Sequence, residues 1–234
     1  MPGTGKDTAQ PRGAADSARP SELGPRYAAT AAVTGIVLAG GRGRRMGGVD
    51  KGLQAFRGRP MVEWVLERLV PQVGEVLINA NQNLERYAEY GYRVVPDEVG
   101  GFAGPLAGLH RGMKEALSPL VATVPCDSPF FPLDLIQRLV RPVTGGQAQL
   151  SVARTGPQAH PVFCVARRDL LAHLEGFLAQ GGRKIDAWYA SLRVVEVAFD
   201  DEPEAFGNFN TLEELRAGEL LKSETRKRDD TKKS

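Results

Sequence analysis

Cysteine is scarce in this sequence, which excludes the kinds of site that depend on it. Only Cys126 and Cys164 occur in 234 residues, and the sequence has no CxxC pair and no Cys/His cluster. Two isolated cysteines do not form the disulfide framework of a small secreted domain, and they lack the spacing of a zinc site. We expect both to be small buried hydrophobic residues in a reducing, cytoplasmic setting.

Long apolar runs and the motifs of acyl transfer are also missing. No run approaches the roughly 18 apolar residues of a membrane helix, so we expect no membrane association. Residues 1–33 lack the apolar core of a secretory signal, and their Asp7, Asp16 and Glu22 are unusual in a mitochondrial transit peptide. The absence of a GxSxG elbow and of a serine–histidine–aspartate order argues against acyl transfer.

No charge of one sign dominates the chain. The formal net charge is +2, and residues 222–234 hold six basic and three acidic residues. That segment alone therefore carries +3, which leaves −1 for the rest of the chain. A body so close to neutrality has no general footprint for nucleic acid, and we expect no nucleic-acid partner.

Composition divides the chain into three parts. Residues 1–33 are rich in Pro, Gly, Ala and Ser without an apolar period, and residues 222–234 are charged and poor in apolar side chains. Neither segment can bury enough surface to offset the entropy lost on ordering, so we expect a disordered extension and a disordered tail. The length of 34–221 suits a single α/β domain.

Short apolar runs alternate with amphipathic segments throughout 34–221. The runs TGIVLA at 34–39 and LVATV at 120–124 have the character of buried parallel strands. We expect strands at 34–39, 76–78, 92–95, 120–124, 149–153, 161–165 and 193–198, and helices at 60–70, 84–90, 106–117, 133–140, 169–180 and 211–221. Such alternation predicts βαβ units and a mostly parallel sheet.

The residues best suited to chemistry follow the predicted strands. A loop rich in glycine and arginine comes after the first strand, Asn79 after the second, Asp97 after the third and Asp127 after the fourth. Open parallel sheets bind ligands at the carboxyl ends of their strands. The sequence therefore predicts one active site at this edge of the sheet.

The loop LAGGRGRRMGGVDKG, residues 38–52, combines glycines with basic side chains. Glycine lets backbone N–H groups turn toward one point, and Arg42, Arg44, Arg45 and Lys51 add positive charge. This composition fits a polyphosphate, although a solvated basic loop would have it too. The spacing matches neither GxxxxGK[ST], because Gly52 follows Lys51, nor the dinucleotide motif GxGxxG.

Asp127 lies in VPCDSPF, directly after a predicted strand. Mg²⁺ in nucleotide sites takes one or two carboxylates together with phosphates and water, and Asp127 could serve in this way. An Asp before Ser-Pro also favours a turn, so the metal role depends on the basic loop nearby. The histidines His110, His160 and His173 have no partner at metal-ligand spacing and suit ordinary surface or core positions.

Four further polar residues allow two interpretations each. Asp97 could accept hydrogen bonds from a base or a ribose, and Asn79 could read a base edge, but both also suit turns. Asn208 and Asn210 precede the last predicted helix. They could cap that helix, or they could contact a metal ion or an acceptor.

The segment LAGGRGRRMGGVDKGL closely resembles the signature loop of the molybdenum cofactor guanylyltransferases, the MobA family. The likeness continues in the family's order through VLINAN, VVPDEVGGFAGPLAGL, VPCDSP, HPVF and NFNTLEEL, and it covers roughly 35–221. The Asp50-Lys51 pair and the later N-x-N-T separate it from the wider nucleotidyltransferase superfamily. Leu212 departs from the family, which commonly has Pro there, and affects only the start of a helix.

The resemblance implies a single Rossmann-like nucleotidyltransferase domain of the α/β class. The implied reaction transfers GMP from GTP to the phosphate of molybdopterin, with or without bound molybdenum, and releases pyrophosphate. Mg²⁺ is the implied cofactor. Molybdoenzymes or their chaperones are the protein partners that such a function allows.

The resemblance also implies roles for individual residues. Positions that bind the nucleotide are matched by Leu38, Ala39, Gly40, Lys51, Asn79, Asp97 and Asp127. The catalytic positions are matched by Arg45, Lys51 and Asp127. Asp127 matches the magnesium ligand and Asn210 a second metal contact, while His160 and Asn208 would face the pterin.

Two other functions stay open on the sequence alone. A sister enzyme would share the fold and the metal site but would use CTP, or a sugar or alditol phosphate as acceptor. Such enzymes often have one glycine after two alanines, whereas this chain has Ala39-Gly40-Gly41. A non-catalytic GTP-binding adaptor for molybdoenzymes would be expected to lose Lys51 or Asp127, and both are present.

Overall fold

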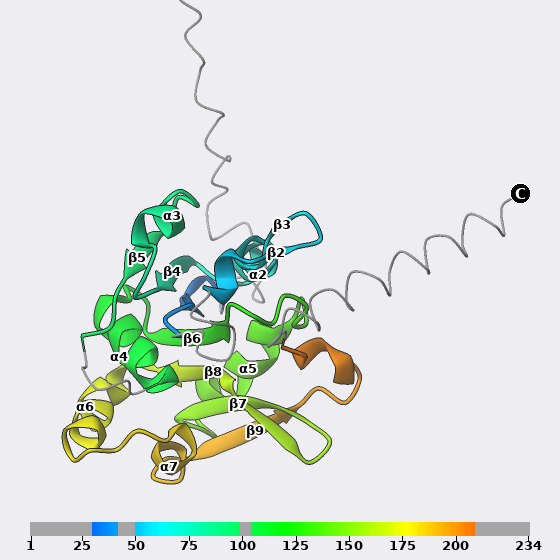
Figure 1. Ribbon diagram of the computed structural model, residues 1–234. Coiled ribbons are helices and arrows are strands. Elements are labelled where there is room, and N and C mark those ends of the chain that lie inside the picture. The colour runs from blue at the N-terminus through cyan, green and yellow to red at the C-terminus, as the bar shows by residue number, and fades with distance from the viewer. Residues whose placement is uncertain (1–29, 42–49, 99–103, 209–234) are drawn as a thin grey trace, which may run out of the picture.

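The computed structural model describes residues 30–41, 50–98 and 104–208. Within these residues seven strands form one sheet in the order β5-β4-β1-β6-β8-β7-β9 (Figure 1). These strands are β1 Val33–Leu38, β4 Glu75–Asn79, β5 Arg93–Val95, β6 Leu120–Pro125, β7 Leu150–Thr155, β8 Gln158–Arg167 and β9 Val194–Ala198. All but β8 run in one direction, which confirms the predicted α/β architecture with a mostly parallel sheet.

Strand β1 lies between β4 and β6 in the parallel half of the sheet. Val33, Ile36 and Val37 of β1 are completely buried. A strand with two covered faces needs consecutive apolar residues rather than alternating ones, and the run at 34–39 supplies them. In the ladder Leu38 lies opposite both Asn79 and Pro125, so β1, β4 and β6 end at the same edge.

Helices cover both faces of the sheet (Figure 1). The helices are α2 Met61–Leu69, α3 Leu84–Ala88, α4 Pro105–Glu115, α5 Leu135–Thr144, α6 Leu171–Ala179 and α7 Ile185–Tyr189. Residues of α2, α3 and α5 share a core cluster with Val37, and residues of α4, α6 and α7 share a second cluster with Ile36. Since neighbouring strand residues point to opposite faces, Ile36 and Val37 assign the two sets of helices to the two faces.

Short 3₁₀ turns and a two-stranded hairpin outside the main sheet join the described elements. The turns are η2 Lys51–Leu53, η3 Val70–Gln72, η4 Arg168–Leu170 and η5 Pro203–Phe206, and the hairpin pairs β2 Ala55–Phe56 with β3 Arg59–Pro60. The sequence did not predict this hairpin. Pro60, which was expected in the first turn of a helix, ends β3 and precedes α2.

Strand β8 differs most from the prediction for 161–165. It is ten residues long and antiparallel to both β6 and β7. The reversal arises because β7 and β8 form a hairpin around a tight turn, where Gly156 has a φ of +50°. Helix α7 was also not predicted as an element of its own.

Some predictions lie outside the described residues. These are the extension up to residue 29, the helix at 211–221, the tail at 222–234, and the side chains of Arg45 and Asn210. Val33, placed at the end of the extension, is the first residue of β1. Cys126 and Cys164 are free and buried, as predicted. Within the described residues, no helix is both long enough and apolar enough to cross a membrane.

Candidate active site

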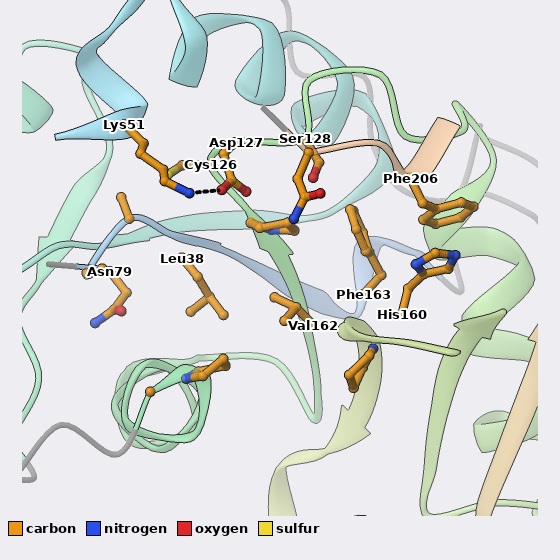
Figure 2. Close-up of a pocket in the computed structure, with 18 of the residues that line it drawn as sticks. Leu38, Lys51, Asn79, Cys126, Asp127, Ser128, His160, Val162, Phe163 and Phe206 are labelled. Carbon is orange, nitrogen blue, oxygen red and sulfur yellow. Dashed lines mark hydrogen bonds and ion pairs between the residues drawn. The ribbon is translucent and has the colours of Figure 1, made fainter. Parts of the chain in front are cut away.

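A pocket of about 770 Å³ opens at the carboxyl ends of β1, β4 and β6. Its lining comes from these strand ends, from the start of α4, from β8 and from the segment after β9. Figure 2 shows Leu38 and Asn79 on one side of the pocket and His160 and Phe206 on the other, with Lys51 and Asp127 between them. The pocket therefore lies at the edge of the sheet that the sequence predicted.

The chain leaves β1 through Ala39 and Gly40, close to the end of β4. The Ala39 N–H donates to the carbonyl oxygen of Asn79 at 2.8 Å, which extends the pairing beyond the strand. A Cβ at Gly40 would lie 2.7 Å from Asn81 Nδ2 and 3.1 Å from Asn79 Oδ1. Gly40 thus leaves room for two amide side chains that a larger residue would displace.

These two amides hold the carboxylate of Asp97. Asn79 is 2% exposed, and its Nδ2 donates to Val95 O at 3.0 Å and to Asp97 Oδ1 at 2.8 Å. Asn81 Nδ2 donates to Asp97 Oδ2 at 2.8 Å, and Asn81 Oδ1 accepts from the Asp97 N–H at 2.8 Å. Each carboxylate oxygen has two lone pairs, so Asp97, which lines the pocket, can accept further bonds from a ligand.

Lys51 and Asp127 form an ion pair in the pocket (Figure 2). Turn η2 presents Lys51, and Asp127 follows the end of β6. Lys51 Nζ lies 2.9 Å from Asp127 Oδ2, and the two side chains are 22% and 14% exposed. Partly exposed pairs contribute little to stability. This pair instead offers a cation for a phosphate and an anion for a metal ion at adjacent positions.

The carboxylate of Asp127 fits a nucleotide-associated Mg²⁺ site. Such sites use one or two carboxylates and leave the remaining positions to phosphates and water. The described part of the chain has no group of three or more His, Cys, Asp or Glu side chains placed to hold a metal. A metal ion at Asp127 would therefore take its other ligands from phosphate oxygens, water and groups other than a cluster of such side chains.

Helix α4 approaches the strand ends closely through a glycine. Gly104 and Pro105, at its start, line the pocket. A Cβ at Gly108 would lie 2.4 Å from Asn79 Oδ1 and 2.5 Å from Leu38 Cδ2. The missing side chain at Gly108 therefore sets how near the helix comes to the amide that holds Asp97.

Aromatic rings form the other end of the pocket. The rings of His160 and Phe206 stack with centroids 4.6 Å apart and planes 9° apart. Phe163 meets Phe206 edge-on, with centroids 5.0 Å apart at 87°. Figure 2 shows these rings on the side away from Asn79. Stacked and edge-on rings form a rigid apolar wall that suits a flat heterocycle.

His160 is held in this wall by a side-chain hydrogen bond. Its Nε2 lies 2.7 Å from Thr155 Oγ1, across the β7–β8 hairpin. Burial lowers the pKa of His160 below its usual 6.5. The other two histidines lie elsewhere. His110 Nε2 faces Glu175 on α6 at 3.3 Å, and His173 Nδ1 accepts from the Trp188 indole at 3.0 Å.

Most of the residues proposed from the sequence meet in this pocket. Its lining includes Leu38, Ala39, Gly40, Lys51, Asn79, Asp97, Asp127, His160 and Asn208. Arg45 and Asn210 lie outside the described residues. The pocket is also lined by Ser128, Gln158 and Phe206, which the sequence did not single out as site residues. For Phe206 the sequence carried no signal, because its partner His160 lies on another element.

Comparisons with known proteins identify the family of this chain. A family model described as "MobA-like NTP transferase domain" matches residues 35–194. The chain is 50% identical over 192 residues to a molybdenum cofactor guanylyltransferase from Cupriavidus taiwanensis, covering 80% of this chain and 96% of that protein. It is 51% identical over 196 residues to one from Ralstonia nicotianae, with the same coverage of 80% and 96%.

A solved structure shares the fold. The crystal structure of molybdopterin-guanine dinucleotide biosynthesis protein A from Archaeoglobus fulgidus matches with a TM-score of 0.69 and 24% identity. The match covers 82% of this chain and 99% of that one. At this identity the likeness bears on the fold alone.

Proposed function

This chain belongs to the MobA family of molybdenum cofactor guanylyltransferases and is a nucleotidyltransferase, and from that premise we propose that it transfers GMP from GTP to molybdopterin. An oxygen of the molybdopterin phosphate attacks the α-phosphorus of GTP. A new P–O bond joins the acceptor oxygen to the α-phosphorus and completes a P–O–P linkage. The bond from the α-phosphorus to the oxygen that bridges the α- and β-phosphates breaks, and pyrophosphate leaves. One observation carries the proposal: a single pocket joins a hydrogen-bonding end, the Lys51–Asp127 ion pair and an aromatic end.

The guanosine of GTP would occupy the end built by Leu38, Ala39, Gly40, Asn79 and Asp97. The exposed lone pairs of Asp97 can accept hydrogen bonds from the N–H groups of guanine or from ribose hydroxyls. Two amides hold this carboxylate in place, so little ordering is needed when the nucleotide binds. Gly40 and Gly41 would let the nucleotide approach the backbone closely.

The phosphates would lie beside Lys51 and Asp127. The Lys51 ammonium has three donors, so it can bond phosphate oxygens while it stays near Asp127. Asp127 would hold Mg²⁺, which supplies positive charge between two phosphate groups that otherwise repel each other. Lys51 would also offset charge on the departing pyrophosphate. We propose Arg45 as a further charge stabiliser and Asn210 as a second metal contact, on resemblance alone.

The acceptor would occupy the aromatic end. A flat pterin can stack against the His160–Phe206 wall. Asn208, two residues after Phe206, also lines the pocket and would offer an amide for polar atoms of the pterin. The Lys51–Asp127 ion pair lies between the two ends (Figure 2). An acceptor bound at the aromatic end would therefore direct its phosphate toward the α-phosphate of GTP. Positioning of this kind provides much of the catalysis in phosphoryl transfer.

Release of pyrophosphate tests this proposal directly. The purified protein would be incubated with Mg²⁺ and with GTP, CTP or ATP, each with molybdopterin or an alditol phosphate as acceptor. We expect release only with GTP and molybdopterin, together with formation of the guanine dinucleotide. Preference for CTP or for the alditol phosphate would contradict the proposal. Tight GTP binding without turnover would favour a non-catalytic adaptor instead.

A further inference from the structure

A hydrogen-bonded cluster lies behind Lys51, outside the pocket lining. The residue before Lys51 is Asp50, whose Oδ1 accepts a hydrogen bond from the Tyr87 hydroxyl at 2.5 Å. Its Oδ2 accepts from Asn83 Nδ2 at 3.0 Å. We propose that Asp50 is a positioning residue that, anchored by Tyr87, holds Lys51 where the triphosphate of GTP binds. This inference rests on the phosphate role proposed for Lys51.

Tyr87 is a fixed anchor because its ring is part of the core. The side chain is completely buried and belongs to the cluster formed with α2 and α5. Close packing prevents the ring from shifting without displacing its neighbours. Burial raises the pKa of Tyr87 well above 10, with further contributions from Cys126 and Asp50. The hydroxyl therefore keeps its proton and remains a donor to Asp50.

Gly52 leaves the space through which this hydroxyl reaches Asp50. A Cβ at Gly52 would lie 2.4 Å from the Tyr87 hydroxyl oxygen and 3.4 Å from Cys126. Any other residue at position 52 would push the hydroxyl away. The sequence Asp50-Lys51-Gly52 thus combines an anchored carboxylate, a cation that lines the pocket and an opening for the anchor.

The backbone of Asp50 is fixed as well as its side chain. Its carbonyl oxygen accepts from the Leu53 N–H at 3.3 Å and from Gln54 Nε2 at 3.4 Å. The Gln54 N–H donates to the Lys51 carbonyl at 3.1 Å, which closes turn η2. Lys51 therefore starts from a backbone that is held on both sides.

This arrangement matters because lysine is flexible. A Lys side chain has four rotatable bonds and loses entropy when it is held at one phosphate. A fixed backbone at Lys51 limits the positions that Nζ can reach and lowers that cost. Asp50 itself does not line the pocket, so its effect on the nucleotide would pass through Lys51.

The Tyr87→Phe substitution tests this inference, since it removes only the hydroxyl. We expect the dissociation constant for GTP, measured by calorimetry with Mg²⁺ and without acceptor, to rise about three- to tenfold. In a Lys51→Ala background, Tyr87→Phe should change this dissociation constant little, because both substitutions act through the contact between Lys51 and the phosphates of GTP. Asp50→Ala should weaken GTP binding similarly. Asp50→Asn, which keeps an oxygen acceptor for Tyr87, should restore most of the affinity.

Tyr90→Phe is the matched control, because it removes a hydroxyl from a tyrosine three residues further on. We expect it to leave GTP affinity unchanged. If Tyr87→Phe weakens GTP binding equally in the presence and in the absence of the Lys51 side chain, the effect is a general structural one and the inference is overturned. Wild-type affinity in both folded Tyr87→Phe and Asp50→Ala would also overturn it. Normal GTP binding by Lys51→Ala alone would instead remove the phosphate role of Lys51, and this inference with it.

Discussion

The two ends of the pocket are held together by different forces. At the polar end, directional hydrogen bonds among Asn79, Asn81 and Asp97 join the end of β4 to the segment after β5. At the aromatic end, which includes His160 and Phe206, stacked rings join β8 to the turn after β9. A hydrogen-bonding network loses much when one partner is removed, whereas ring packing responds more gradually to changes of shape.

This difference suggests how the two substrates would be distinguished. A polar site built to satisfy a particular set of donors rejects ligands that leave its groups unpaired, often by large factors. An apolar wall discriminates among flat ligands by shape and only modestly. We therefore expect strict selection of the nucleotide at the polar end and looser selection of the acceptor at the aromatic end. The substitutions below test this contrast.

Asp127→Asn should have the largest effect, because Asp127 lies where the two ends meet. It keeps the shape of the side chain but removes the charge that would hold Mg²⁺. We expect a loss of several kcal/mol of transition-state stabilisation, or roughly 10²-fold or more in turnover. The readout is pyrophosphate release against magnesium concentration, with circular dichroism to confirm folding.

The control for this change is Asp134→Asn. Asp134 is an acidic residue that precedes α5 and does not line the pocket. This substitution should leave turnover unchanged. A turn-forming role for Asp127 would predict near-normal activity in Asp127→Asn, since Asn also suits turns. A folded Asp127→Asn protein with the wild-type rate and magnesium dependence would remove Asp127 from the metal site.

A pair of glycines on α4 tests the polar end more selectively. An added Cβ at Gly108 meets Asn79 Oδ1 at 2.4 Å, whereas the three atoms nearest to one at Gly112 all belong to Ile36 in the core, the first at 1.8 Å. Overpacking costs about 1–3 kcal/mol, so Gly108→Ala should weaken GTP binding about tenfold by moving the amide that holds Asp97. Gly112→Ala should lower the melting temperature and spare GTP affinity.

Helix propensity does not distinguish Gly108→Ala from Gly112→Ala, because alanine favours a helix interior equally at both positions. GTP affinity would be measured by calorimetry and stability by thermal unfolding. Equal losses of GTP affinity in the two variants would show that the polar end depends on the general packing of α4. The specific contact between Gly108 and Asn79 would then have no separate role.

The contrast between the ends also explains what the sequence could predict. Parallel strands end at one edge, so Lys51, Asn79, Asp97 and Asp127 could be brought together by assigning strands alone. The aromatic end required the reversed direction of β8 and the contact between His160 and Phe206. Those features depend on how distant segments pack, and apolar periodicity does not report such pairings.

The cluster around Asp50 was missed for a similar reason. A fully buried tyrosine looks like any other core residue in sequence, and only the structure shows that its hydroxyl faces Asp50. The resemblance identified the Asp50-Lys51 pair without giving a physical role for its first member. Side-chain contacts between η2 and α3 lie beyond what spacing along the chain can predict.

Phe206→Leu should have a moderate effect that is confined to the acceptor. Leucine keeps most of the apolar volume but removes the ring that stacks on His160. Ring contacts contribute about 0.5–1.5 kcal/mol, so the apparent KM for molybdopterin should rise up to about tenfold. The dissociation constant for GTP should stay at the wild-type value. A rise confined to GTP would reverse the proposed assignment of the two ends.

The smallest expected effect concerns the pH dependence of stability at His160. Burial lowers the pKa of His160 in the folded protein below the usual 6.5, so the unfolded chain takes up a proton at higher pH than the folded one. The stabilisation that the neutral His160 ring contributes is therefore complete above pH 6.5 and is lost as the pH falls through the folded-state pKa.

The His160→Gln variant tests this expectation, because glutamine cannot titrate and keeps a polar group for Thr155. The drop in melting temperature between about pH 7.5 and pH 5.5 should be smaller in this variant by at most about 1–2 °C, because solvent screens a partly exposed group. GTP affinity at the higher pH should not change, because His160 lies at the aromatic end. If both proteins lose the same stability on acidification, burial of this imidazole does not contribute to the pH dependence.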